Sequence, residues 1–219
     1  MRLALFDVDE TLIRGDSEVL WCRYLTENGI RDMRGIDGFM KAYEAGNLDF
    51  DAFSRFQLRP LAELPEDLLV EHRSRFLAEM ITPRLFDTAL ARVIDHSQRG
   101  HEVLAISAAY EFIAAPVANL AGIDRGLYTD AEHDGNAYTG RVQGTPCFRE
   151  GKVERLTSWL AERGEGPEVL ESSWFYSDSH NDLPLLRRVG NPVAVRPDPK
   201  LRAVAEASGW EVLEDTLAS

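Results

Sequence analysis

Asp7-Val8-Asp9-Glu10-Thr11, which follows the apolar run Leu3-Ala4-Leu5-Phe6, decides the fold of this chain. The four apolar residues show no polar alternation, which predicts a short strand buried on both faces of a parallel sheet. Two carboxylates then stand two residues apart where the strand should end, and ligands of open α/β sheets bind at the carboxyl ends of strands. Like charges so close together are costly unless a cation or a proton offsets them. The stretch therefore favours a metal-binding nucleophile followed by an acid/base residue. The alternative is an ordinary strand-to-turn boundary, where Asp and Thr are common.

The composition is that of a globular protein with few possible classes of partner. The chain has 219 residues, 44% hydrophobic and 28% charged, enough for one large domain or a core with a smaller insertion. The formal net charge of -13 disfavours nonspecific binding to nucleic acid or anionic lipid, so neither is expected as a partner. No stretch approaches the roughly 18 consecutive apolar residues that span a bilayer, and a signal peptide before the first strand is not expected. A cytoplasmic location is expected. Cys22 and Cys147 stand in unrelated contexts and are expected to be buried small hydrophobes.

Residues 16–83 are predicted to form a small all-helical unit inserted directly after the first strand. Apolar residues recur at helical spacing around residues 20–25, 39–43, 50–57 and 68–80. Gly29, Gly46 and Pro60 are predicted to end the first three helices, and Pro65 to open the fourth. Residues 1–15 and 84–219 would then form the core.

After this unit the chain alternates between helix and strand patterns. Strands are predicted at 101–106, 174–176 and 192–195, and helices at 88–98, 112–120, 152–163 and 183–189. Segments 128–133 and 137–142 flank Asp134-Gly135-Asn136, a strong hairpin-turn signal. The predicted fold class is therefore α/β, a doubly wound parallel sheet with an inserted all-helical cap.

Two later polar residues stand where a strand should end or a helix should begin. Ser107 follows an apolar strand, where a hydroxyl with free amides behind it suits an anion; the alternative is an N-cap serine. Lys152 follows Gly151 at the start of an amphipathic helix, where a lysine opposes the helix macrodipole. A phosphate or carboxylate partner would explain why a lysine stands at this position. The alternative is a solvated surface side chain.

A second acidic cluster, Ser177-Asp178-Ser179-His180-Asn181-Asp182, follows the strand at 174–176. Its place matches that of Asp7 and Asp9, so a divalent cation shared between the two clusters is predicted. Hard oxygen ligands of this kind suit Mg²⁺, which takes one or two carboxylates, several waters and a substrate phosphate. The alternative is that Asp178 and Asp182 serve only as turn or cap residues.

These motifs, in this order, resemble the four ordered motifs of the haloacid dehalogenase-like (HAD) superfamily. The helical insertion resembles the cap of its phosphoserine-phosphatase-like branch. The stretches 6–12, 15–17, 147–152 and 176–186 look closest to bacterial histidinol-phosphatase-like members. The resemblance covers nearly the whole chain and implies a Rossmann-like core with phosphatase activity.

The resemblance also implies roles for the residues around the first motif. Asp7 would be the nucleophile that forms an aspartyl-phosphate, and Asp9 the general acid and then the general base. Thr11 would orient Asp9 or the second step. Mg²⁺ would lie between Asp7, the main-chain carbonyl of Asp9, and Asp178.

The remaining motifs are implied to bind phosphate and to support these groups. Ser107 and Lys152 would hold the phosphate oxygens, because a phosphate dianion approaches a carboxylate only when cations offset the repulsion. Asp182 would brace Lys152 or a metal-bound water. Asn181 would reach metal or substrate.

The substrate is expected to be a small, amino-bearing phosphorylated metabolite such as histidinol phosphate. Asp16 stands five positions after Thr11, where phosphoserine phosphatases contact the substrate's amino group; the alternative is that Asp16 caps the first helix. Ser107-Ala108-Ala109 replaces the serine and glycines usual in that branch, which argues against phosphoserine itself. Arg55 and Arg59 are expected to be solvated helix charges.

Four other functions are compared with this expectation. A phosphoserine phosphatase or a phosphotransferase of the same fold would use the same residues. A phospho-Asp signalling receiver also combines Asp, Mg²⁺, a hydroxyl and Lys, but it lacks the second Asp and a helical insertion of this size. A catalytically inactive binding module is disfavoured because every catalytic position is filled.

Overall fold

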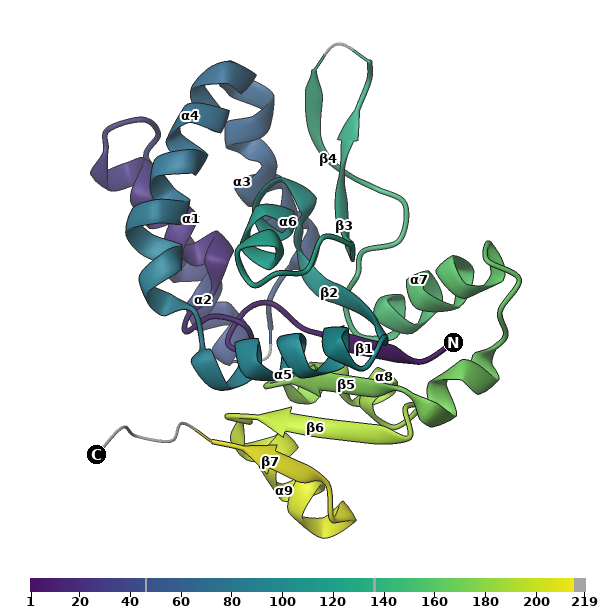
Figure 1. The fold of residues 1–219 in the computed structure, drawn as a ribbon. Helices are drawn as coiled ribbons and strands as arrows, with labels where there is room; N and C mark the ends of the chain where they lie inside the picture. Colours follow the sequence, from purple (N-terminus) through teal and green to yellow (C-terminus); the bar gives the residue numbers. More distant parts are fainter. Residues whose placement is uncertain (46, 136, 215–219) are drawn as a thin grey trace.

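The computed structural model describes residues 1–45, 47–135 and 137–214, and in them seven strands form one sheet (Figure 1). The strand order is β4-β3-β2-β1-β5-β6-β7. The strands are β1 (Leu3–Phe6), β2 (Glu102–Tyr110), β3 (Gly126–His133), β4 (Tyr138–Gln143), β5 (Trp174–Ser177), β6 (Asn191–Val195) and β7 (Glu211–Leu213). Neighbouring strands are parallel except β3 and β4, which form an antiparallel hairpin. The predicted, mostly parallel sheet is confirmed.

Helices cover both faces of the sheet, because strand side chains alternate between two apolar layers. Leu3 and Leu5 pack into one buried cluster, and Ala4 and Phe6 into the other. The first cluster includes side chains of α7 (Glu150–Ala161), α8 (Leu183–Leu186) and α9 (Pro199–Ser208). The second includes α5 (Asp87–Gln98) and α6 (Glu111–Leu120). The doubly wound α/β class is therefore confirmed, with β1 fully buried near its centre.

Four helices stand between β1 and α5, as a group beside the sheet (Figure 1). They are α1 (Ser17–Glu27), α2 (Ile36–Glu44), α3 (Phe50–Glu63) and α4 (Glu66–Phe76), followed by a π-helical turn (Leu77–Ile81) and a 3₁₀ turn (Thr82–Arg84). One apolar cluster runs without interruption from these helices to the sheet. The boundary at residues 16 and 83 therefore stays a prediction. Gly46, predicted to end the second helix, lies outside the described residues.

The β3–β4 hairpin leaves the edge of the sheet and packs against α3 (Figure 1). Gly140 in β4 has φ +79°, and a Cβ added there would lie 3.3 Å from the Cβ of Ala62 in α3. The hairpin was predicted between 128–133 and 137–142, and both strands are present; Asn136 of the predicted turn lies outside the described residues. Its contact with the helical unit was not predicted.

Several predicted ends were wrong. The strand predicted to end at residue 106 continues to Tyr110, because the pairing with β3 is irregular after Ile106 and resumes at Tyr110 opposite Thr129. The helix predicted to end at Pro60 continues to Glu63, since Leu64 N–H still donates to the carbonyl of Pro60 at 3.0 Å. α7 begins at residue 150 rather than 152, and α8 ends at residue 186 rather than 189.

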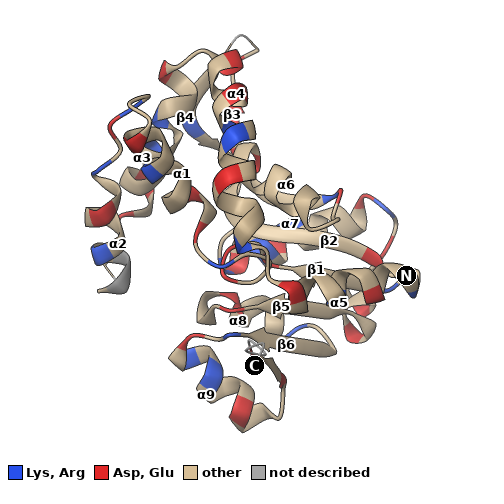
Figure 2. Ribbon diagram, turned by 60° about the vertical axis from the view of Figure 1, so that its left-hand side comes forward, with Lys and Arg blue, Asp and Glu red and all other residues tan. Residues whose placement is uncertain are grey.

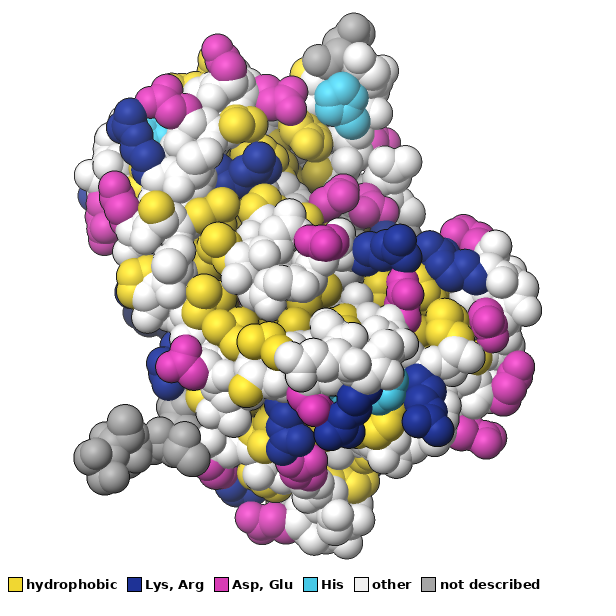
Figure 3. All heavy atoms as spheres, viewed as in Figure 1, with side chains coloured by type: hydrophobic (Ala, Val, Ile, Leu, Met, Phe, Trp, Pro, Cys, Tyr) yellow, Lys and Arg dark blue, Asp and Glu magenta, His cyan; other side chains and the backbone are white. Residues whose placement is uncertain are grey.

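Charged residues lie both on the helices α1–α4 and on the sheet with the helices that cover it (Figure 2). On the face that Figure 3 shows, basic side chains lie beside acidic ones. Ion pairs of the structure include that of Arg99 with Asp95 and that of Arg125 with Glu102. Across the described ranges, no helix combines the length and the hydrophobicity that crossing a membrane requires.

Candidate active site

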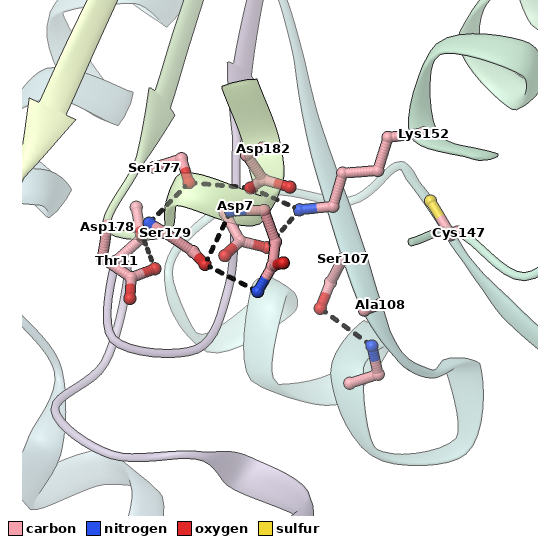
Figure 4. Close-up of polar contacts among 12 residues, drawn as sticks. Asp7, Thr11, Ser107, Ala108, Cys147, Lys152, Ser177, Asp178, Ser179 and Asp182 are labelled. Carbon is pink, nitrogen blue, oxygen red and sulfur yellow. Dashed lines mark hydrogen bonds and ion pairs between the residues drawn. The ribbon is translucent and has the colours of Figure 1, made fainter. Parts of the chain in front are cut away.

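The predicted polar residues from distant parts of the chain meet in one cavity of about 310 Å³ (Figure 4). Asp7 and Asp178 directly follow β1 and β5, and Ser107 lies in β2, so three adjacent parallel strands bring them to one edge of the sheet. Lys152 reaches the cavity from the first turn of α7, and Asp182 from a 3₁₀ turn before α8. All five side chains line the cavity.

Lys152 is buried between two carboxylates, so the alternative of a solvated surface lysine is wrong. Its side chain is 3% exposed, and Nζ donates to Oδ1 of Asp7 at 2.9 Å and to Oδ2 of Asp182 at 2.7 Å (Figure 4). Burial alone would lower the pKa of Lys152, but Asp182 and Asp7 raise that pKa above its usual value. Ser177 Oγ also donates to Oδ2 of Asp182, at 2.7 Å. The lysine therefore carries its charge in the protein, and Asp182 holds it in place.

Asp7 and Asp178 are carboxyl groups with raised pKa values, and nearby cations offset their negative charge only in part. Burial raises the pKa of Asp7 to about 6, although Lys152 opposes this shift. Burial raises the pKa of Asp178 well above its usual range, and the charges of Asp7 and Asp182 raise it further. Thr11 Oγ1 donates to Oδ1 of Asp178 at 3.3 Å. The hydroxyl predicted to orient Asp9 thus contacts Asp178.

Asp9 is oriented by the start of α1. Its Oδ1 accepts a hydrogen bond from the backbone N–H of Ser17 at 2.7 Å. Burial raises the pKa of Asp9 well above its usual range, and the charge of Asp16 adds to the shift. Between Asp9 and Thr11 the backbone of Glu10 has φ +52°, a left-handed conformation in which Glu10 N–H bonds to the carbonyl of Gly15 at 3.2 Å. A carboxyl group with a raised pKa is suited to give up a proton near neutral pH.

The oxygen atoms around Asp7 and Asp178 are suited to bind a divalent cation, although they do not include three metal-binding side chains. Within residues 1–45, 47–135 and 137–214, no group of three or more His, Cys, Asp or Glu side chains is arranged to hold a metal. The set implied by the resemblance has only two such side chains, Asp7 and Asp178, with the main-chain carbonyl of Asp9. These are hard oxygen donors of the kind Mg²⁺ takes. The buried Asp7 and Asp182 and the half-buried Asp178 have only the single charge of Lys152 among them, which leaves room for a further positive charge.

Ser107 lies inside β2 and does not cap a helix, so the N-cap alternative is wrong. The residue is 1% exposed, and its Oγ accepts a hydrogen bond from the N–H of Ala109 at 3.1 Å. The helix that follows starts four residues later, at Glu111, with Tyr110 at its N-cap position and no side-chain cap bond. The hydroxyl proton of Ser107 is therefore available to an anion in the cavity.

Asp16 caps the first helix, as one interpretation of its position predicted, and its contact with a substrate amino group stays a prediction. Its Oδ1 caps α1 by accepting from the N–H groups of Glu18 and Val19 at 3.0 and 2.9 Å, and the residue also lines the cavity. Burial raises the pKa of Asp16. Asn181 lines the cavity as predicted, and its Oδ1 accepts from Nε of Arg149 at 3.0 Å.

The cavity lining does not include Thr11, His180, Arg55 or Arg59, which were discussed from the sequence. Thr11 contacts Asp178 instead. His180 contacts Asp198 through Nδ1 at 2.8 Å. Arg55 is exposed, and Arg59 pairs with Glu63 one helical turn away at 3.0 Å. The two arginines are thus surface charges of α3, as expected.

Glu18 is a cavity residue that sequence reasoning missed. Its Oε1 accepts from the N–H of Tyr110 at 3.0 Å, and its Oε2 from Nε2 of Gln57 at 2.9 Å. Burial raises the pKa of Glu18 to about 8, and the charge of Asp16 adds to the shift. A signal was available, because Glu18 precedes the buried Trp21 and Cys22 by three and four residues and so shares their helix face.

Aromatic side chains close the cavity on the helical side, and these were also missed. Phe50, at the start of α3, stacks on Phe148, which precedes α7, with ring centroids 5.6 Å apart and planes 7° apart. Both rings line the cavity, together with Phe53, Met40 and Leu48. The contact joins the helical unit to the core beside the cavity.

Comparison with known proteins agrees with this geometry. The sequence profile of the family "haloacid dehalogenase-like hydrolase" matches residues 4–187. A histidinol-phosphatase of Neisseria meningitidis is 45% identical over 217 residues, which cover 96% of this chain and 97% of the relative. A phosphoserine phosphatase of Mycobacterium tuberculosis is 31% identical over an alignment of 222 residues, covering 98% of this chain and 71% of the relative. A crystal structure of a protein of unknown function from Bordetella pertussis Tohama I matches with a TM-score of 0.91 and 38% identity over 97% of each chain.

The chain belongs to the haloacid dehalogenase-like hydrolase family, as its four ordered motifs predicted. Within this family it is a phosphatase, in keeping with its histidinol-phosphatase and phosphoserine phosphatase homologues. The family assignment removes the signalling receiver as an alternative.

Proposed function

We propose that this phosphatase hydrolyses a small, amino-bearing phosphate monoester, such as histidinol phosphate, through an aspartyl-phosphate on Asp7. The observation that carries the proposal is the pair of Asp7 and charged Lys152, 2.9 Å apart at the end of a cavity large enough for a small metabolite. The 45% identity to a histidinol-phosphatase over nearly the full length supports this substrate. Asp16, which lines the cavity, would accept a hydrogen bond from the substrate's amino group.

In the first step a carboxylate oxygen of Asp7 forms a bond to phosphorus while the bond to the ester oxygen breaks. Asp9 donates its proton to that departing oxygen, for which its raised pKa is suited. Lys152 and the Ser107 hydroxyl hold phosphate oxygens, so the dianion can approach a carboxylate. In the second step a water oxygen attacks phosphorus, Asp9 takes the water's proton, and Asp7 is released with inorganic phosphate.

Asp7, Asp178 and the main-chain carbonyl of Asp9 would hold Mg²⁺. When bound, this ion supplies positive charge that reduces the repulsion between the phosphate and the carboxylates. Thr11, 3.3 Å from Oδ1 of Asp178, would fix the direction of that ligand. Residues 16–83 would act as a cap, since they contribute Asp16, Glu18 and Phe50 to the cavity lining.

The proposal is tested by a screen of phosphate monoesters with Mg²⁺ that contains histidinol phosphate, phosphoserine and simple sugar phosphates. Histidinol phosphate is expected to give the highest kcat/KM, and chelation by EDTA is expected to stop turnover until Mg²⁺ is restored. An added acceptor alcohol distinguishes hydrolysis from transfer, because a phosphotransferase would make the phosphorylated alcohol at the expense of inorganic phosphate. Full rates in EDTA-treated protein would contradict the proposal.

A further inference from the structure

Positive charge in the cavity is confined to its phosphate end. Among the described residues that line it, only Lys152 has a cationic side chain, and this lysine contacts Asp7 and Asp182. Two arginines lie near the cavity but are not part of its lining. Arg149 donates to Asn181, and Arg196 donates to the main-chain carbonyl of Ile13 at 3.0 Å. The part of a substrate beyond its phosphate group therefore meets no cationic side chain of the described lining.

Glu18 is the carboxylate that this part of the substrate meets on the helical side. Each of its oxygens accepts one hydrogen bond, from Tyr110 N–H at 3.0 Å and from Gln57 Nε2 at 2.9 Å. These donors come from the end of β2 and from the middle of α3, so the carboxylate is fixed between the core and the helical unit. Because burial raises the pKa of Glu18 to about 8, a cationic nitrogen beside it is what would favour its ionised form near neutral pH. An ionised carboxylate has about four acceptor positions, and two donors leave the others available to such a ligand.

The surroundings of Glu18 favour a cationic nitrogen over any other group. Phe50 and Phe53 line the same cavity, and aromatic faces attract cations that have lost water. Hydrogen bonds from a charged nitrogen to a carboxylate are among the strongest in proteins, and exclusion of water strengthens them. A carboxylate on the substrate would instead lie beside two acidic side chains, Glu18 and Asp16, with no cationic side chain there to offset its charge.

We propose that Glu18 is a specificity-determining residue of this phosphatase. Its carboxylate accepts a hydrogen bond from a cationic or N–H-bearing group of the substrate, Gln57 positions that carboxylate, and phosphate monoesters that carry a carboxylate are rejected. The inference rests on the proposed function and deepens it: with Asp16 binding an amine, Glu18 selects substrates with a second nitrogen donor, such as an imidazole.

The test is the ratio of kcat/KM for histidinol phosphate to kcat/KM for p-nitrophenyl phosphate, a monoester without a nitrogen donor. Glu18→Gln keeps the size of the side chain and is expected to lower this ratio about 10- to 100-fold, the scale of a lost charge-assisted hydrogen bond. The same variant is expected to raise activity on phosphoserine relative to p-nitrophenyl phosphate. Gln57→Leu keeps the charge but loses the positioning bond, so a smaller fall in the first ratio is expected.

Glu111→Gln is the matched control, because Glu111 is an exposed acidic residue next to Tyr110 that does not line the cavity. Its ratio should stay within about twofold of the wild type, since exposed charges interact weakly. Thermal melting of each variant shows whether it is folded.

If folded Glu18→Gln kept the wild-type ratio of the two kcat/KM values, the inference on Glu18 would be overturned. Mg²⁺-dependent turnover by the wild type would still support the proposed function in that case. If the wild type hydrolysed none of the monoesters, the proposed function would fail. Calorimetric binding of histidinol phosphate to the wild type and to Glu18→Gln would then decide the inference by itself, with equal affinities counting against it.

Discussion

The cavity has two sides that differ in how their charged side chains are bound. We call Asp7, Ser107, Lys152, Asp178 and Asp182 the floor, and Asp16, Glu18, Phe50, Phe53 and Gln57 the roof. In the floor, charged side chains contact one another, as Lys152 does with two carboxylates within 2.9 Å. In the roof, carboxylates contact backbone N–H groups and an amide, beside apolar rings. The difference suggests that phosphate chemistry resides in the floor, and that selection among substrates resides in the roof.

The largest effect is expected from Asp7→Asn in the floor. The amide is a poor nucleophile, so turnover of every phosphate monoester should fall by roughly 10⁴-fold or more. The protein should stay folded, because Asn fits the space of Asp and carries no buried charge. Steady-state kinetics on two unrelated substrates, with circular dichroism of the variant, measure both parts. Retained activity would remove Asp7 as the nucleophile and would end the distinction between floor and roof.

Lys152→Met should be the most destabilising of these changes, because it leaves two buried carboxylates without their cation. Removal of one partner from a buried ion pair costs about 3–5 kcal/mol of unfolding free energy. Urea denaturation near neutral pH measures the loss. Lys200→Met is the matched control, since Lys200 is exposed in the first turn of α9 and its removal should cost less than about 0.5 kcal/mol.

A double variant sharpens this result. Adding Asp182→Asn to Lys152→Met removes one of the two uncompensated carboxylates and should recover part of the lost stability. If the double variant were no more stable than Lys152→Met, repulsion between Asp7 and Asp182 would not be the cause of the loss.

The floor could be predicted from the sequence, whereas of the roof only Asp16 was. Asp7 and Asp178 directly follow strands that the apolar pattern revealed, and Ser107 lies in a third. Parallel strands bring their ends together whatever the details of packing. The roof depends on how helices pack, as when Phe50 meets Phe148 from almost 100 residues further along the chain. Local patterns carry no such information. The same holds for β2, whose extension to Tyr110 depends on its pairing with β3.

On two of the strands that carry the floor, Phe6 and Tyr176 form a buried layer with His96 of α5. The contribution of this layer to the free energy of unfolding should depend on pH. Phe6 and Tyr176, which precede the two acidic motifs, stack with ring centroids 4.4 Å apart, and Tyr176 Oη lies 2.8 Å from Nε2 of His96. Burial, with a smaller contribution from the neighbouring His101, lowers the pKa of His96 to about 4. Because the unfolded chain binds this proton more readily, the stabilisation from neutral His96 is complete above about pH 6.5 and is lost as the pH falls toward 4.

The expected loss of unfolding free energy from His96 is roughly 1–2 kcal/mol between pH 6.5 and pH 5. The buried carboxyls of the cavity have raised pKa values and act in the opposite direction, so the informative quantity is the difference in pH slope between wild type and His96→Asn. Urea titrations at half-unit pH steps measure it. His133→Asn, in the exposed part of the hairpin, serves as the control and should keep the wild-type slope. Equal slopes for wild type and His96→Asn would show that this buried layer does not sense pH.

The smallest effect is expected where the roof meets the core. Phe148→Ala removes a stacked ring pair worth about 1 kcal/mol, because both rings are only half-buried. If the roof holds the substrate and the floor transforms it, KM should rise several-fold while kcat changes little, since the catalytic groups stay in place. Phe39→Ala removes a ring that contacts Phe53 and Phe56 but lies outside the cavity lining, so a comparable loss of stability should leave KM nearly unchanged. A fall in kcat with unchanged KM for Phe148→Ala would instead mean that closure of the roof positions the reacting groups, and the two sides could not be treated as separate.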